Sequence, residues 1–160
     1  MSDATITNLI RACVIKKDNA ITDKVFEQAS PQLRDSLTFQ AELTRAFLSC
    51  GDYYSGMRLV KEFISRGLTN NDTNNILLEG LAEGRFFQEC IRLYQLIMVE
   101  REKNPSICLY SHGYAAVIRS ACQLKRRPLA EDLFNEMKER RIPIPDVVFF
   151  EVCDVMIDDG

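Results

Sequence analysis

Pairs of apolar triplets at a fixed interval constrain this sequence more than any other feature. Each triplet occupies positions i, i+1 and i+4, which lie on one face of an α-helix. Thr44 is the one polar residue among the members. The first residues of two paired triplets are 16 residues apart four times along the chain: Leu9 and Val25, Leu43 and Leu59, Leu77 and Leu93, Val117 and Leu133. Such a pair predicts a helical hairpin, and the recurrence predicts a repeated hairpin.

The hairpins follow one another at nearly constant steps of 34, 34 and 40 residues, and a weaker copy begins at Cys153. Because a lone hairpin cannot bury its apolar face, neighbouring hairpins must stack. We therefore predict an all-α solenoid of four helix-turn-helix repeats and a terminal half-repeat, in a single domain over residues 1–160. The expected repeats span about 3–36, 37–70, 71–110, 111–146 and, in part, 147–160. The face left open by the half-repeat should be covered by more chain or by a partner.

Glycine and proline punctuate these repeats. We expect helices over 4–17, 21–30, 38–50, 54–66, 73–83, 86–101, 111–126, 128–140 and 147–157. Gly51 and Gly84 are expected to end first helices in the left-handed conformation, and Gly67 to end a second helix. Pro128 suits the first turn of a helix, whereas Pro31 is expected between helices.

Composition excludes several classes of protein. No apolar run approaches the roughly 20 residues that cross a bilayer. The net charge of −3 counts against a dedicated nucleic-acid binder, which is usually basic. The start of the chain has neither the apolar core of a secretory signal nor the Arg- and Ser-rich character of a transit peptide, so we expect no targeting peptide within it.

The chemistry-bearing residues predict no metal, cofactor or small-molecule substrate. The six cysteines form no C-x-x-C pair, and His112 is the only histidine. We expect reduced thiols that act as small core residues. His112 has no nucleophile-elbow glycine pattern near it, so we do not expect an enzyme.

The segment 130–146 resembles the second helix and exit of the pentatricopeptide repeat (PPR), which reads roughly A-x-x-L-F-x-E-M-x-x-x-G-I-x-P-D. The matching residues are Ala130, Leu133, Phe134, Glu136, Met137, Ile142, Pro145 and Asp146. Arg141 replaces the glycine, and one extra residue precedes Pro145. Segments 75–81, 61–68 and, more loosely, 114–122 look similar to other parts of the repeat. The tetratricopeptide pattern fits less well because the chain has no Trp, and another helical array is the remaining alternative.

The resemblance implies a right-handed, degenerate PPR array located in a mitochondrion or plastid. It also implies that two positions of each repeat, the reading positions, contact one RNA base. Carried over, the pairs are Thr7 with Ser36, Ala41 with Asn70, Asn75 with Tyr110, and Ala115 with Asp146. Base edges are read by short polar side chains, so only the first pair approaches completeness. The RNA-reading apparatus is therefore expected to be degraded.

Charged and aromatic side chains supply the other candidate contacts. The candidate phosphate contacts are Lys16, Lys17, Arg119, Lys125, Arg126 and Arg127, although cations also favour helix C-termini for electrostatic reasons. The candidate partner contacts are Tyr54, Phe86, Glu151, Asp154 and Asp158. We also expect the expanded junction 100–110 to bind a partner, since insertions in solenoids map to one face. Segment 69–75 is expected to be a turn in which Asp72 or Thr73 caps the next helix.

These observations favour a non-catalytic scaffold with protein partners, as a subunit of a larger organellar assembly or ribonucleoprotein. The alternative, which rests on the resemblance, is a protein that binds single-stranded RNA in organelle RNA processing or translation.

Overall fold

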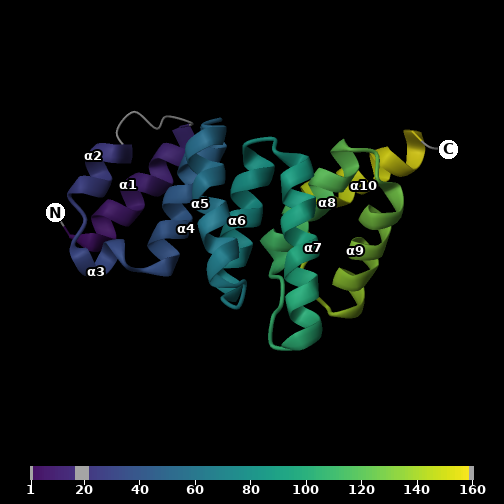
Figure 1. The fold of residues 1–160 in the computed structure, drawn as a ribbon. Helices are drawn as coiled ribbons and strands as arrows, with labels where there is room; N and C mark the ends of the chain where they lie inside the picture. Colours follow the sequence, from purple (N-terminus) through teal and green to yellow (C-terminus); the bar gives the residue numbers. More distant parts are fainter. Residues whose placement is uncertain (1, 17–21, 159–160) are drawn as a thin grey trace.

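The computed structural model describes residues 2–16 and 22–158, which form ten helices and, within those ranges, no strand. The helices are α1 (Asp3–Lys16), α2 (Thr22–Glu27), α3 (Pro31–Arg34), α4 (Leu37–Ser49), α5 (Tyr53–Arg66), α6 (Asn71–Glu83), α7 (Phe87–Lys103), α8 (Ser111–Gln123), α9 (Arg127–Glu139) and α10 (Asp146–Asp158). Figure 1 shows them in chain order along one axis, with the two ends of the chain at opposite ends of the molecule.

The helices form two layers. The first helices of the hairpins, α1, α4, α6 and α8, pack side by side and continue into α10. The second helices, α2, α5, α7 and α9, each pack on the first helix that precedes them. The expected all-α solenoid of helical repeats is confirmed.

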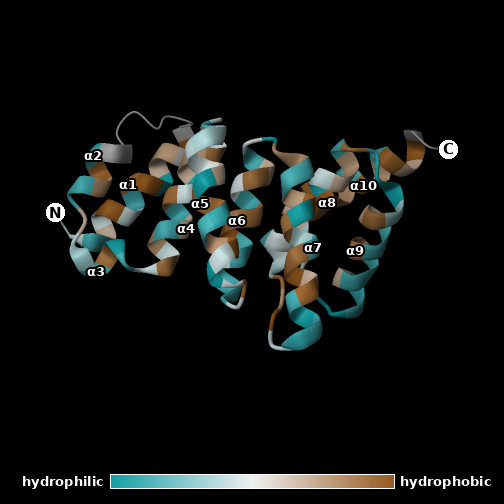
Figure 2. Cartoon of the chain, viewed as in Figure 1, coloured by the Kyte–Doolittle hydropathy of each residue, from teal (hydrophilic) through white to brown (hydrophobic). Residues whose placement is uncertain are grey.

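The core lies between and within the hairpins. Leu77, Leu93, Val117 and Leu133 are each at most 2% exposed and belong to one apolar cluster that extends from α4 to α10. A smaller cluster joins α1, α2 and α4. Figure 2 shows hydrophobic and hydrophilic residues interspersed along the same helices, as amphipathic packing requires. Thr44, the one polar residue of the triplets, is buried, and its hydroxyl is not left without a partner, because it donates to the Gln40 carbonyl at 2.7 Å.

Within the described chain, the turns between α4 and α5, between α6 and α7, and between α8 and α9 each use a left-handed residue, which is not always a glycine. Gly51 has φ +83°, as predicted, whereas the prediction for Gly84 is wrong: its φ is −77°, and Arg85 is left-handed at +66°. Lys125, at +57°, fills the same role between α8 and α9. Gly84 is needed for space, because a Cβ there would lie 2.2 Å from the Leu48 carbonyl oxygen.

Two helix starts differ from expectation. The short helix α3 was not anticipated: the Ser30 hydroxyl accepts a hydrogen bond from the Leu33 amide at 3.1 Å, and Pro31 occupies the first turn. Helix α6 is capped by Asn70, whose Oδ1 accepts from the Thr73 amide at 2.9 Å, not by Asp72 or Thr73.

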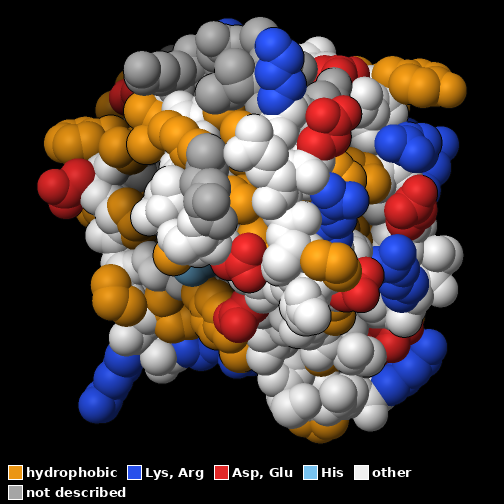
Figure 3. All heavy atoms as spheres, turned by 90° about the vertical axis from the view of Figure 1, so that its left-hand side faces the viewer, with side chains coloured by type: hydrophobic (Ala, Val, Ile, Leu, Met, Phe, Trp, Pro, Cys, Tyr) orange, Lys and Arg blue, Asp and Glu red, His pale blue; other side chains and the backbone are white. Residues whose placement is uncertain are grey.

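The two ends of the stack differ in their surface. At the N-terminal end, Figure 3 shows hydrophobic side chains mixed with charged side chains of both signs. At the other end, α10 buries Val148, Val152 and Val155 in the core. Its other apolar side chains are exposed in the structure: Val147, Phe149, Phe150, Met156 and Ile157.

Candidate functional site

The layer of first helices is hollowed along its length. One hollow, of about 380 Å³, is lined by residues of α1, α4, α6 and the start of α8, and we call it the α4–α6 hollow. A second, of about 460 Å³, lies between α1, α4, α6 and α8. A third, of about 270 Å³, lies between α6, α8 and α10, and we call it the α6–α10 hollow. The hollows share lining residues, among them Arg45, Glu79 and Arg119, so they form one first-helix groove.

Arginine and glutamate side chains alternate along this groove. Arg11 Nε on α1 lies 3.3 Å from Glu42 Oε1 on α4. Arg45, also on α4, reaches forward to α6, where its Nη1 lies 3.4 Å from Glu79 Oε2. Its Nε donates to both carboxylate oxygens of Glu83 at 3.2 Å, and its Nη1 is 3.9 Å from Glu42 Oε2. Arg45 thus pairs with three carboxylates on two consecutive first helices, α4 and α6.

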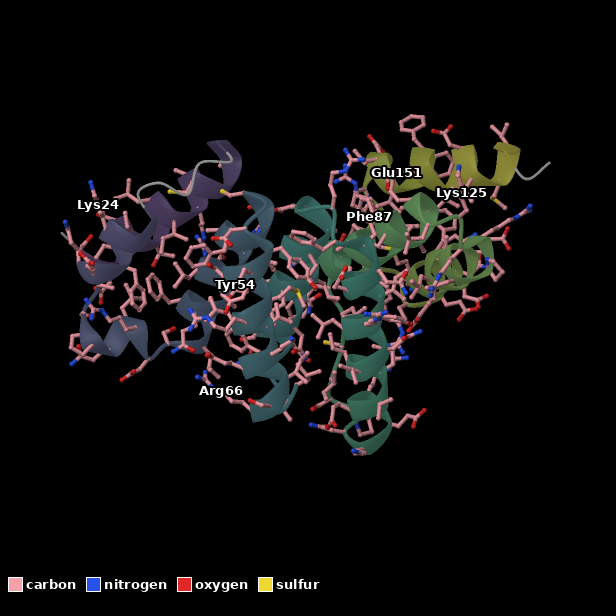
Figure 4. The ribbon with its side chains drawn as sticks, turned by 45° about the horizontal axis from the view of Figure 1, so that its top comes forward. Lys24, Tyr54, Arg66, Phe87, Lys125 and Glu151 are labelled. Atoms are coloured by element: carbon pink, nitrogen blue, oxygen red, sulfur yellow. The ribbon has the colours of Figure 1, made fainter. Side chains whose placement is uncertain are left out.

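A further pair continues the pattern at the other end of the groove. Arg119 Nε on α8 lies 3.3 Å from Glu151 Oε1 on α10. In Figure 4, Glu151 and Lys125 are labelled on the same side of the molecule, and both line a smaller hollow together with Asp154. Consecutive first helices are therefore tied by ion pairs from α1 to α6 and from α8 to α10.

Burial shifts the protonation equilibria of these groups. Burial raises the pKa of Glu79, although the charge of Arg45 opposes the shift. Burial likewise raises the pKa of Glu151 against the opposing charge of Arg119. For Arg45, burial lowers the pKa, but the hydrogen bond to Glu83 and the surrounding carboxylates outweigh it, so the net shift is upward. Arg11, Arg45 and Arg119 therefore each form an ion pair with a carboxylate of the chain itself.

The side chain of Asn75, a reading position, is also hydrogen-bonded within the fold. It is 0% exposed; its Oδ1 accepts from the Tyr110 amide at 2.8 Å, and its Nδ2 donates to the Asn71 carbonyl at 2.7 Å. Asn71 acts in the same way one turn earlier, where its Oδ1 accepts from the Cys108 amide at 3.0 Å. A base edge cannot reach the Asn75 amide in this arrangement.

These two asparagines hold the expanded junction against α6. Four residues of helix rise about 6 Å, and two residues of extended chain span about 6.6 Å, so Asn71 and Asn75 match the amides of Cys108 and Tyr110. Ile107 and Leu109, on the alternate positions, are buried. The prediction that segment 100–110 binds a partner is untested, but residues 107–110 are docked on the repeat itself. Sequence reasoning missed this role of the asparagines.

Three further reading positions are engaged at helix starts. The Ser36 hydroxyl accepts from the Phe39 amide at 3.4 Å and caps α4, as Asn70 caps α6. The Tyr110 hydroxyl donates to Asp72 Oδ1 at 2.9 Å, and this bond raises the pKa of Tyr110. Each side chain therefore has a partner that an RNA base would have to displace.

The remaining reading positions differ in exposure. Ala41 is 0% exposed, whereas Ala115 lines the α6–α10 hollow. The Thr7 hydroxyl donates to the Asp3 carbonyl at 3.0 Å. Asp146 is exposed at the first residue of α10. The four pairs do not present a repeated set of base-reading groups.

The candidate phosphate contacts are dispersed. Lys17 and the side chain of Lys16 lie outside the described residues. Arg119 is in the ion pair described above, and Arg127 donates to a glutamate one turn later in α9 at 2.7 Å. Residues 125–126 occupy the turn that precedes α9.

The candidate partner contacts fall into two groups. Tyr54 is 82% exposed on α5, and Asp154 is exposed on α10. Phe86, by contrast, packs against the core with its ring centroid 5.1 Å from that of Tyr53, so its ring is largely used by the fold. Glu151 belongs to the groove, and the side chain of Asp158 lies outside the described part of the chain.

The described residues form neither a metal-binding cluster nor a membrane-spanning helix. Over residues 2–16 and 22–158, no cluster of His, Cys, Asp and Glu has the arrangement of a metal site. Over the same ranges, no helix combines the length and apolar character needed to span a membrane.

One hairpin of the chain matches the model of a known repeat family. The family model described as a PPR repeat matches residues 114–142, which run from the first turn of α8 to just past the end of α9. A comparison with curated proteins found no match to the chain.

Proposed function

We propose that this chain, a degenerate array of pentatricopeptide type with a PPR repeat at residues 114–142, is a non-catalytic scaffold that binds protein neighbours. We place it in a larger organellar assembly or ribonucleoprotein, because PPR proteins are typically organellar helical-repeat proteins that bind RNA or serve as scaffolds. The geometry of the first-helix groove supports the scaffold over the RNA-binding alternative.

The ion pairs along the groove carry this proposal. RNA affinity comes largely from cations that neutralise phosphates. Here a phosphate would have to compete for Arg45 with three carboxylates that are already within 4 Å of it. Arg11 and Arg119 are held by Glu42 and Glu151. A groove of mixed sign suits the charged and polar side chains of a protein partner better than a polyanion.

Exposed aromatic surface adds a second support. Tyr54 is 82% exposed near the start of α5, where its ring offers contact area and its hydroxyl a hydrogen bond. Such amphipathic aromatics are enriched at the centres of protein interfaces. Tyr54 therefore stays a candidate anchor, whereas Phe86 does not.

The alternative, binding of single-stranded RNA in organelle RNA processing or translation, is favoured by the match of residues 114–142 to a PPR repeat. Lys125 and Arg126, in the turn that follows α8, and Arg127, at the start of α9, are also consecutive in the sequence.

One experiment separates the two functions. The purified chain is titrated into labelled single-stranded RNA of mixed sequence at about 50 mM and about 200 mM salt, since electrostatic binding is strongest at low salt. In parallel, cross-linking mass spectrometry in the native source maps protein contacts. The scaffold predicts no saturable RNA binding and protein cross-links on the groove or near Tyr54. Saturable binding that weakens at high salt, without protein cross-links, would overturn it.

A further inference from the structure

The α6–α10 hollow has an apolar floor made of small side chains. Ala82 on α6, Ala116 on α8 and Val148 on α10 are 2–6% exposed, and the half-buried Ala115 lies beside them. Because three consecutive first helices contribute short side chains here, the hollow of about 270 Å³ is left between them. It is smaller than a typical small-molecule site of about 300–1,000 Å³. The size fits one long side chain of a partner.

Carboxylates dominate the rim of this hollow. Glu79 and Glu83 approach from α6, and Glu151 from α10; Arg119 is the one arginine or lysine in the lining. Arg119 contacts Glu151 through Oε1, whereas Glu151 Oε2 is buried without a hydrogen-bond partner among the described residues. A buried acceptor in that state costs about 1–3 kcal/mol. A donor that enters the hollow would recover this free energy.

The neighbouring α4–α6 hollow also combines carboxylates with arginines, here Arg11 and Arg45. It shares Glu79 and His112 with the first hollow, and its carboxylates also include Glu42 and Asp72. Glu42 is 4% exposed, and its Oε2 likewise has no hydrogen-bond partner within the described chain. Each of the two adjacent hollows is therefore lined by a glutamate with one buried carboxylate oxygen that accepts no hydrogen bond from the described residues, although Glu42 Oε2 lies 3.9 Å from Arg45 Nη1.

We propose that the first-helix groove binds an extended basic segment of a protein partner, with an arginine side chain seated in the α6–α10 hollow and a second one in the α4–α6 hollow. The aliphatic part of an arginine covers apolar surface while its charged end stays polar. Its planar guanidinium offers five donors to carboxylates, which neither a phosphate nor a neutral side chain supplies. This proposal rests on the protein-binding function proposed above and names the chemistry of the partner.

The spacing of the two seats sets the spacing of the arginines. Neighbouring packed helices lie about 8–10 Å apart. An extended chain of polyproline II type advances about 3.1 Å per residue with three residues per turn, so every third side chain lies on the same face. Arginines at every third residue would therefore meet successive hollows. A peptide of three Gly-Ser-Arg triplets, capped at both ends, is the matching probe.

The test measures binding of this peptide by methyl and amide NMR on the intact chain. We expect the methyl signals of Ala82, Ala115, Ala116 and Val148 to shift saturably. A second peptide carries citrulline, which has nearly the same shape as arginine but no charge, at the same positions. Because a hydrogen bond to a charged group contributes about 1.5–3 kcal/mol, the citrulline peptide should bind at least tenfold more weakly.

Two variants locate the site, and a third is their control. Ala115→Leu fills the α6–α10 hollow without a change of charge, and Glu79→Gln removes a carboxylate common to both hollows; each should weaken peptide binding about tenfold. Glu62→Gln is the matched control, because Glu62 is exposed on α5 and removal of its charge leaves the groove unchanged. Far-ultraviolet circular dichroism checks that every variant keeps its helices.

The outcomes separate this proposal from the scaffold function. Equal binding of the citrulline peptide, shifts confined to other surfaces, or unchanged binding by Ala115→Leu would each overturn the arginine seats. If the Ala115→Leu chain retains the protein cross-links of the wild-type chain, the scaffold function stands and the partner binds elsewhere. If the chain binds RNA at about 50 mM salt and cross-links to no protein, the scaffold function itself fails.

Discussion

The contact between Gly113 and Asn75 allows a sharp test of how the expanded junction is held. A Cβ built on Gly113, in the first turn of α8, would lie 1.9 Å from Asn75 Oδ1 and 2.9 Å from its Cγ, but 3.6 Å from its Cβ. Alanine at position 113 therefore collides with the amide group of Asn75, whereas it would fit against an alanine at position 75. Gly113→Ala and Asn75→Ala, alone and together, form a double-mutant cycle.

The expected free energies follow from two opposing effects. Within a helix, alanine is favoured over glycine by about 0.5–1 kcal/mol. Displacement of the Asn75 amide breaks its bonds to the Tyr110 amide and the Asn71 carbonyl. Each buried group left unpaired costs about 1–3 kcal/mol. We expect Gly113→Ala to destabilise the wild-type chain by about 2–3 kcal/mol, and to be neutral or stabilising by up to about 1 kcal/mol in the Asn75→Ala background.

Urea unfolding followed by circular dichroism gives the free energy of unfolding for the four proteins of the cycle. An unchanged m value would show that the unfolded surface area is the same in each. Gly80→Ala is the control, since a Cβ there meets Arg45 and not Asn75. Its effect should add to that of Asn75→Ala within about 0.5 kcal/mol. If Gly113→Ala has the same cost in both backgrounds, Asn75 is not what obstructs position 113, and the proposed docking of the junction is wrong.

Three further predictions test the stack, its ion pairs and its turns. Leu93→Asp should cost about 3–5 kcal/mol in the same unfolding assay, because it buries an unpaired charge; a variant as stable as the parent would refute the stacking. Arg45→Met should lower the free energy of unfolding by about 2–4 kcal/mol at pH 7, since it removes the cation that pairs with the half-buried carboxylates of Glu79 and Glu83. The folded-state pKa of Glu79 is already raised above 4.5, so stability falls as pH rises from there through the raised value. The loss of Arg45 should extend that fall in stability to higher pH. The difference in free energy of unfolding between the variant and the wild type should therefore shrink toward pH 5, and a difference that stays constant with pH would contradict this. Arg141 has a left-handed backbone at φ +55°, which glycine adopts more easily than arginine does. Arg141→Gly should therefore raise the free energy of unfolding by about 0.5–1 kcal/mol and the Tm by about 1–4 °C, and a fall in Tm would contradict this.

The architecture was predictable because it depends on periodicity alone. The triplets at a 16-residue interval fix which residues of each hairpin turn inward, and Leu77, Leu93, Val117 and Leu133 are buried as that pattern requires. Local details depend on contacts that a periodic pattern does not contain. The left-handed turn falls on Arg85 and Lys125 because the backbone geometry of the stack fixes its position, even where a glycine is adjacent.

Most of the groove could not be predicted, because its contacts join residues about one repeat apart. Arg45 and Glu79 are 34 residues apart, which equals the step between their hairpins, and Asn71 and Cys108 are 37 apart. A search for opposite charges at the repeat step on first helices would have found Arg45 with Glu79. The asparagine pair gave a fainter signal: two amides four residues apart, followed one repeat later by alternating apolar residues in a non-helical junction.

The ion pairs between consecutive first helices also determine which ligands the groove can bind. A phosphate would bind Arg45 only by drawing it away from Glu42, Glu79 and Glu83, so RNA binding would loosen the contact between α4 and α6. A cationic side chain can bind without breaking these ion pairs, because it can donate to carboxylate oxygens that accept no hydrogen bond in the structure, such as Glu42 Oε2 and Glu151 Oε2. A ligand that binds the folded chain in preference to the unfolded chain raises its Tm by linkage. The basic peptide should therefore raise the Tm, whereas RNA, whose binding must first break these ion pairs, should bind weakly and leave the Tm nearly unchanged. A larger rise in Tm with the basic peptide than with RNA at the same concentration would thus support a cationic partner, and the reverse order would contradict it.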